Sequence, residues 1–168
     1  MISKHILGET TDVIELDGKD SVRDHTLALT QQTEKFLVIT SRQLDHHVFD
    51  NSDYLAALTQ WVTKKTQVKV KVLIQRTDPC ITKGHRLVNL YQKLPSHLSI
   101  RRFGEKHKNY NEAFVMADKM GYLHLALADR YQGQVCYADS NRCQQLSDFF
   151  TEAWDQSEEI ADFRSFRI

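Results

Sequence analysis

Short apolar runs, separated by longer stretches with apolar residues at helical spacing, fill the first half of the chain. Residues 35–40 and 68–74 are rich in apolar and β-branched side chains, which is typical of strands covered on both faces of a sheet. Weaker patterns of the same kind predict an opening strand at residues 12–16 and another strand at residues 98–103. These four runs predict the first strands of one sheet.

The stretches between these runs carry helix signals. Residues 21–33 predict a helix with a thin apolar face. Residues 51–53 offer an N-cap, and apolar side chains at helical spacing follow it. Asp78 and the proline after it open a third helix, which Pro95 closes. Helices that alternate with buried strands indicate parallel pairing of those strands.

The second half of the chain has a different pattern. Residues 113–117 and 122–128 predict a hairpin joined by a glycine turn, and residues 134–138 predict another strand. Asp139 or Ser140 caps a final helix with a strong apolar face. The hairpins favour an antiparallel edge beside the parallel strands. The fold class is therefore expected to be α/β, with a mixed β-sheet and helices on both faces.

The chain has 168 residues and neither repeats nor a linker, so we expect one domain over residues 1–156, followed by a charged tail at 157–168. The formal net charge is zero, which gives no general attraction to nucleic acid or to an anionic membrane. No apolar run has the length of a signal peptide core or a membrane span. The three cysteines are widely spaced, which favours free thiols and a cytoplasmic location.

The segment NEAFVMAD at residues 111–118 has the frame of a His-x-Lys-x4-Asp motif. Asp118 and the apolar residues before it are present, but Asn111 stands at the histidine position and Ala113 at the lysine position. This degenerate motif and the order of elements resemble one domain of the phospholipase D-like superfamily, over about residues 35–154. The chain looks most similar to small bacterial domains of that superfamily that have no known function.

The resemblance implies a fold more strongly than an activity. In intact members the histidine attacks phosphorus, the lysine balances the developing charge, and the aspartate orients the imidazole. Asn111 is no nucleophile, Ala113 has no charge, and the sequence contains no second motif. We therefore expect a catalytically inactive domain that binds a ligand or a protein. His107 and Lys108, just upstream, form a displaced pair that no longer fits the motif spacing.

The expected binding cleft combines the motif with the nearby basic group, which would receive an anionic small ligand. Its six candidate residues are Arg102, His107, Lys108, Asn111, Glu112 and Asp118. A homodimer or a complex with another protein is the other partnership expected. One alternative is a hydrolase or transferase that acts on a phosphate-containing substrate with His107 and either Glu112 or Asp118. Another is a nucleic-acid accessory domain, against which the neutral charge counts.

Asp45, His46, His47 and Asp50 have the side chains of metal ligands. Adjacent histidines on an extended backbone point to opposite sides, however, and the segment has no pair of histidines at helical spacing. We therefore expect no metal site. The sequence also has no glycine-rich nucleotide motif, so no cofactor is expected, and its aromatic residues are expected in the core.

Overall fold

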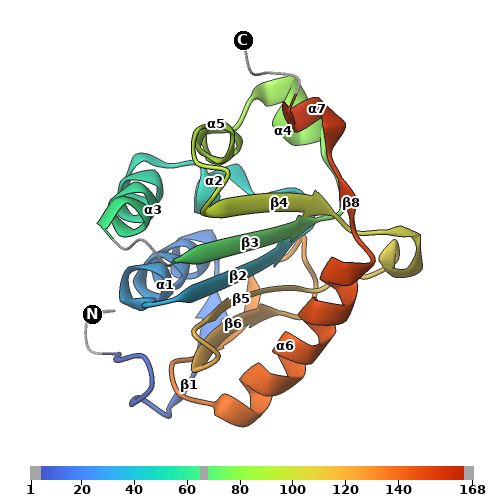
Figure 1. Cartoon of the computed structure of the whole chain (residues 1–168). Coiled ribbons are helices and arrows are strands. Elements are labelled where there is room, and N and C mark those ends of the chain that lie inside the picture. Colours follow the sequence, from blue (N-terminus) through green and yellow to red (C-terminus); the bar gives the residue numbers. More distant parts are fainter. Residues whose placement is uncertain (1–4, 65–67, 165–168) are drawn as a thin grey trace.

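The computed structural model describes residues 5–64 and 68–164, and its centre is an eight-stranded mixed sheet (Figure 1). The strands are β1 Val13–Asp17, β2 Phe36–Ser41, β3 Lys69–Ile74, β4 Leu98–Arg102, β5 Ala113–Ala117, β6 Gly121–Leu125, β7 Gln132–Cys136 and β8 Glu158–Glu159. Their order in the sheet is β1-β7-β6-β5-β2-β3-β4-β8. β2, β3 and β4 are parallel and the other pairs are antiparallel, so the predicted mixed sheet is confirmed.

Helices cover both faces of this sheet, as the sequence predicts. The helices are α1 Lys19–Gln32, α2 His46–Phe49, α3 Ser52–Lys64, α4 Asp78–Lys83, α5 Arg86–Lys93, α6 Ser140–Asp155 and α7 Ala161–Arg164, with a 3-10 turn η2 at Glu105–His107. α6 lies on the opposite side of the sheet from α1, α3 and α5 (Figure 1). Among the described residues, no helix combines the length and the apolar character needed to cross a bilayer.

β5 shows how the two hydrophobic cores divide the sheet. Ala113, Val115 and Ala117 belong to the larger core, which includes residues of α1, α3 and α5. Phe114 and Met116 belong to a second core with residues of α6. Because successive side chains of a strand point to opposite faces, a strand buried on both faces reads as a continuous apolar run.

β3 was expected to be covered on both faces, but its first half is covered on one face only. Lys69 and Lys71 are exposed, whereas Val70 and Val72 are buried. Phe36 at the start of β2 is 51% exposed, although its aromatic ring was expected in the core. The first halves of β2 and β3 are therefore open on the face that carries α6.

Two helices differ from the sequence prediction. The helix expected from Asp78 to Pro95 is two helices, because the chain turns at Gly84 with φ 74° and His85 then caps α5 by accepting the Leu87 N–H. α2 was not predicted, and its N-cap is Asp45, whose carboxylate accepts two backbone N–H groups. His46 and His47 therefore lie on a helix and not on an extended backbone.

The described part of the expected C-terminal tail packs on the domain. Glu158 and Glu159 pair antiparallel with Arg102 and Arg101 at the edge of β4. Ile160 is buried in the larger hydrophobic core, as is Phe163 of α7. Glu158 and Glu159 thus extend the sheet, and the two buried apolar side chains anchor the segment that follows.

Candidate functional site

A cleft of about 590 Å³ lies where the parallel strands β2, β3 and β4 end. Carboxyl ends of adjacent parallel strands meet at one edge of a sheet, and ligands of open α/β sheets bind outside that edge. β5 runs antiparallel to β2, so its first residues lie at the same edge. The lining residues are Arg42, Gln75, Arg76, Arg102, Phe103, Gly104, Glu105, Lys108, Asn109, Tyr110, Asn111 and Glu158.

The backbone holds Arg42 and Arg76 next to each other. Arg42 directly follows β2, and Arg76 lies two residues beyond the end of β3. The Arg76 N–H donates to the Arg42 carbonyl oxygen at 2.7 Å, and the Gln75 N–H donates to the same oxygen at 3.0 Å. The parallel pairing of β2 and β3 therefore continues into the two residues that present guanidinium groups to the cleft.

Residues 104–111 form the opposite wall of the cleft. The Gln75 side-chain amide donates to the carbonyl oxygens of His107 at 3.1 Å and Tyr110 at 2.5 Å. The Tyr110 ring stacks on Phe149 of α6, with the ring centroids 4.4 Å apart. This wall is therefore fixed both to the end of β3 and to α6.

Acidic residues neutralise half of the basic side chains in the cleft. Arg102 pairs with Glu158 at 2.8 Å, and Lys108 pairs with Glu105 at 2.7 Å. The hydrogen bond that the Lys108 ammonium donates to Glu105 also raises the pKa of Lys108. Arg42 and Arg76 have no ion pair and no side-chain hydrogen bond with any described residue. The cleft thus presents two guanidinium groups whose charge no carboxylate balances.

The structure brings three of the six predicted site residues into this cleft and leaves three outside it. Arg102, Lys108 and Asn111 line it. Arg42 and Arg76 were missed, although a basic residue just after each predicted parallel strand is a signal for the carboxyl edge of the sheet. The cleft therefore combines three of the predicted residues with two arginines that the sequence analysis did not single out.

Asp118 lies at the other end of β5, about 23 Å of extended chain from Asn111. Its carboxylate accepts the backbone N–H groups of Glu34 at 2.6 Å, Lys35 at 2.8 Å and Phe36 at 2.9 Å. These bonds fix the chain as it enters β2. Asp118 therefore holds backbone in place and does not line the cleft, unlike the Asn111 end of the motif.

His107 and Glu112 also do not line the cleft. The centroid of the His107 ring lies 6.3 Å from that of Phe103 and 5.5 Å from that of Phe149. Its Nδ1 is buried without a partner among the described residues. The Glu112 carboxylate pairs with His124 at 2.7 Å. The described geometry therefore does not assemble the acid–base pair of the hydrolase alternative.

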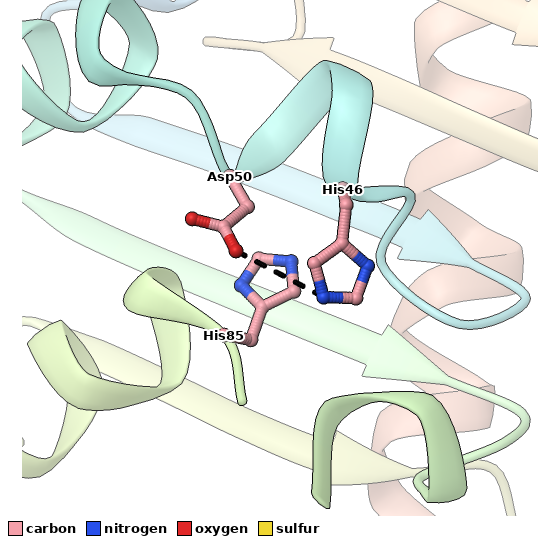
Figure 2. Close-up of side chains that lie close together, drawn as sticks. All are labelled: His46, Asp50 and His85. Carbon is pink, nitrogen blue, oxygen red and sulfur yellow. Dashed lines mark ion pairs between the residues drawn. The ribbon is translucent and has the colours of Figure 1, made fainter. Parts of the chain in front are cut away.

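A second cluster, outside the cleft, joins His46 and Asp50 to His85 (Figure 2). One potential ligand atom from each lies within 4.8 Å of the others, and the His46 Nε2 to Asp50 Oδ2 distance is 3.8 Å. Burial lowers the pKa of His85 to about 4, so its ring is neutral at pH 7. By side-chain type, the cluster suits a transition metal.

Hydrogen bonds already occupy these potential ligands. His85 Nδ1 accepts the Leu87 N–H at 3.1 Å, so Nε2 carries the proton and donates to the Leu44 carbonyl at 3.0 Å. His46 Nε2 donates to the Gly84 carbonyl at 2.9 Å. Asp50 Oδ1 accepts from Arg86 at 2.7 Å. A metal ion would have to displace some of these bonds beside a guanidinium, which argues for a structural role of the cluster.

Comparison with known proteins places the chain in a family. Residues 18–166 match the model of a domain of unknown function, DUF7931. The chain belongs to this family. A comparison with curated proteins finds no match.

Solved structures that resemble this domain share its fold at low sequence identity. Nuc from Salmonella typhimurium, a phospholipase D family member, is 14% identical with a TM-score of 0.60, over 90% of this chain and 97% of Nuc. NucT from Helicobacter pylori is 12% identical with a TM-score of 0.59, over 89% of this chain and 100% of NucT. The DUF7931 domain therefore has a phospholipase D-like α/β fold.

The archaeal chromatin protein TrmBL2 has the same fold in part of its chain. It is 18% identical with a TM-score of 0.63, and the match covers 88% of this chain. The match covers 53% of TrmBL2, so this chain spans about half the length of that protein.

Proposed function

We propose that this domain binds a phosphate-bearing anion in the cleft at the ends of β2, β3 and β4, without hydrolysing it. The observation that carries the proposal is the adjacent placement of Arg42 and Arg76, which lack acidic partners among the described residues. A guanidinium matches two phosphate oxygens at once, so two adjacent groups suit a doubly charged phosphate.

The absence of reactive side chains at the motif positions supports binding over catalysis. Asn111 lines the cleft at the histidine position, and a carboxamide does not attack phosphorus. Ala113, at the lysine position, is buried and uncharged. The nearest histidine in sequence, His107, packs among aromatic rings and is not a lining residue. These features support a pseudoenzyme that binds its ligand without turning it over.

A thermal-shift series tests this proposal. The probes are inorganic phosphate, nucleoside monophosphates and glycerol phosphate. A probe at about 100 times its Kd adds roughly 2.7 kcal/mol of stability, which raises Tm visibly. The shift should disappear in Arg42→Gln with Arg76→Gln and persist in Arg130→Gln, an exposed arginine outside the cleft. A flat response of the wild-type protein to all probes would remove the basis for an anion site.

A nucleic-acid backbone is the second candidate ligand for the same cleft. The fold likeness to TrmBL2, described as a chromatin protein with a novel mode of DNA binding, favours it. Adding single-stranded and double-stranded oligonucleotides to the series separates the two. A Kd that weakens steeply with salt, while small phosphates leave Tm unchanged, would assign the site to the polyanion.

A further inference from the structure

A groove of about 580 Å³ runs beside α6, over the open first halves of β2 and β3. Its strand side includes Phe36, Val38 and Met116, and its helix side includes Phe150 and Trp154. Phe36 is 51% exposed, although β2 is a central strand of the sheet. Val38 and Trp154 are half-buried, whereas Met116 and Phe150 are buried. An exposed aromatic side chain in an apolar groove of a central strand is typical of a surface that a partner covers.

The groove is basic. Lys69, Lys71 and Lys119 line it, and Asp155 is the one acidic residue among the lining residues that the structure describes. Lys71 Nζ lies 5.1 Å from the centre of the Trp154 ring. An occupant of this groove therefore needs carboxylates that can face lysines placed around apolar side chains.

The outer face of α6 has the complementary charge. Asp148 and Glu152 are exposed along it, about one turn apart, and Asp155 follows one turn later where α6 borders the groove. Glu152 is partly neutralised by Lys106 at 2.7 Å, whereas Asp148 bonds the uncharged Gln144 side chain at 2.8 Å. An acidic helix and a basic groove thus lie side by side on one face of the molecule.

We propose that a second copy of this chain covers the groove, with α6 of each copy lying on the open sheet face of the other. A two-fold axis between the helices makes both contacts at once, so the assembly closes as a dimer. Acids of one α6 then face lysines of the partner's groove. A direct groove-to-groove contact would instead place lysines against lysines. The inference is independent of the anion site, because the groove and the cleft share no lining residue.

Charge reversal with complementation tests this interface. The first variant carries Lys69→Glu and Lys71→Glu, and the second carries Asp148→Lys and Asp155→Lys. Wild-type protein at about 100 µM, a hundredfold above a micromolar Kd, should sediment as a dimer. Each variant alone should sediment as a monomer, and an equimolar mixture should form the heterodimer because the reversed charges match across one of the two contacts.

A matched control changes charge on the other face. Lys83→Glu with Lys93→Glu alters exposed lysines of α4 and α5 and should remain dimeric. Circular dichroism spectra of all variants should match the wild type. A wild-type monomer at about 100 µM overturns the proposal. The proposal is also overturned if both charge-reversed variants remain dimeric. If the monomer binds a single-stranded oligonucleotide and Lys69→Glu with Lys71→Glu abolishes that binding, the groove belongs to nucleic acid instead.

Discussion

The Arg76 backbone N–H donates to the Arg42 carbonyl oxygen at 2.7 Å, so two cationic side chains leave the sheet from hydrogen-bonded neighbours. Ordinary β pairing brings them together, with no special loop. Both side chains line the cleft, and the described residues supply neither with a carboxylate. A bound anion would balance their charge.

Removing either arginine should weaken anion binding. A hydrogen bond to a charged group contributes about 1.5–3 kcal/mol, so Arg42→Gln or Arg76→Gln should raise the Kd for phosphate by about 10- to 150-fold. Isothermal titration at low salt measures the change. Equal affinity in both variants and the wild type would place the anion elsewhere.

Neutralising Glu158 should have the opposite effect. Its carboxylate pairs with Arg102 at 2.8 Å on the edge of the cleft. Glu158→Gln frees this guanidinium and removes a negative charge, so anion affinity should rise by about 3- to 10-fold. Glu159→Gln, on the next residue and outside the lining of the cleft, is the control. A decrease in affinity for Glu158→Gln would show that the carboxylate itself contacts the ligand.

Asp118 should matter for stability and not for binding. Asp118→Ala removes the acceptor of three backbone N–H groups at the entry to β2. Water can reach these exposed amides, so the expected loss is about 1–3 kcal/mol in the free energy of unfolding. Urea denaturation gives this value. Phosphate binding to the folded variant should match the wild type, and loss of binding without loss of stability would contradict the structural role.

Gly104 should tolerate no side chain. A Cβ there would lie 2.1 Å from the Gln156 carbonyl oxygen, which belongs to the backbone at the end of α6. Gly104→Ala must displace either the 104–111 wall or α6, at a cost of about 1–3 kcal/mol. Gly18→Ala is an instructive control, since open space surrounds that position and only its φ of 96° resists the change. A Gly104→Ala protein as stable as the wild type would contradict the close approach.

His85 should make the domain less stable in mild acid. Its folded-state pKa is about 4, against 6.5 for an ordinary histidine, because burial opposes its charge. Between these values the unfolded chain binds more protons, so stability is fully present above about pH 6.5 and falls as the pH decreases to about 4. The expected loss is about 2–3 kcal/mol. Burial also lowers the pKa of His25, which acts in the same direction.

Denaturation curves at pH 4.5 and pH 7.5 measure this effect, with His85→Asn as the comparison. The asparagine variant should lose part of the pH dependence while being less stable at pH 7.5, because it replaces a cap and a bond to Leu44. An unchanged pH dependence in this variant would assign the acid sensitivity to other groups.

The sequence predicts the sheet and its two helical layers well, because runs such as the one at β5 need apolar side chains on both faces. The sequence pattern does not predict helix boundaries that depend on a single residue. Gly84 divides the helix expected up to Pro95, since its positive φ ends α4. Asp45 begins α2 because its carboxylate accepts two backbone N–H groups. Apolar periodicity does not predict a helix of this kind.

The site was only partly predictable for a different reason. The motif at residues 111–118 spans the whole of β5, so its first and last residues lie at opposite ends of the strand. Only the Asn111 end reaches the cleft. Arg42 and Arg76 lie 34 positions apart and become neighbours through parallel pairing. Knowing the order of the parallel strands is necessary to see that their following residues converge.

The two residues of β8 have a consequence for handling the domain. They cover the outer edge of β4 at Arg101 and Arg102, where backbone N–H and C=O groups would otherwise be free to pair with another sheet. Ending the polypeptide at residue 156 would uncover this edge and remove the anchoring side chains of Ile160 and Phe163. Such a shortened protein would be prone to edge-to-edge aggregation, which would mask the reversible dimer that α6 and the groove are proposed to form.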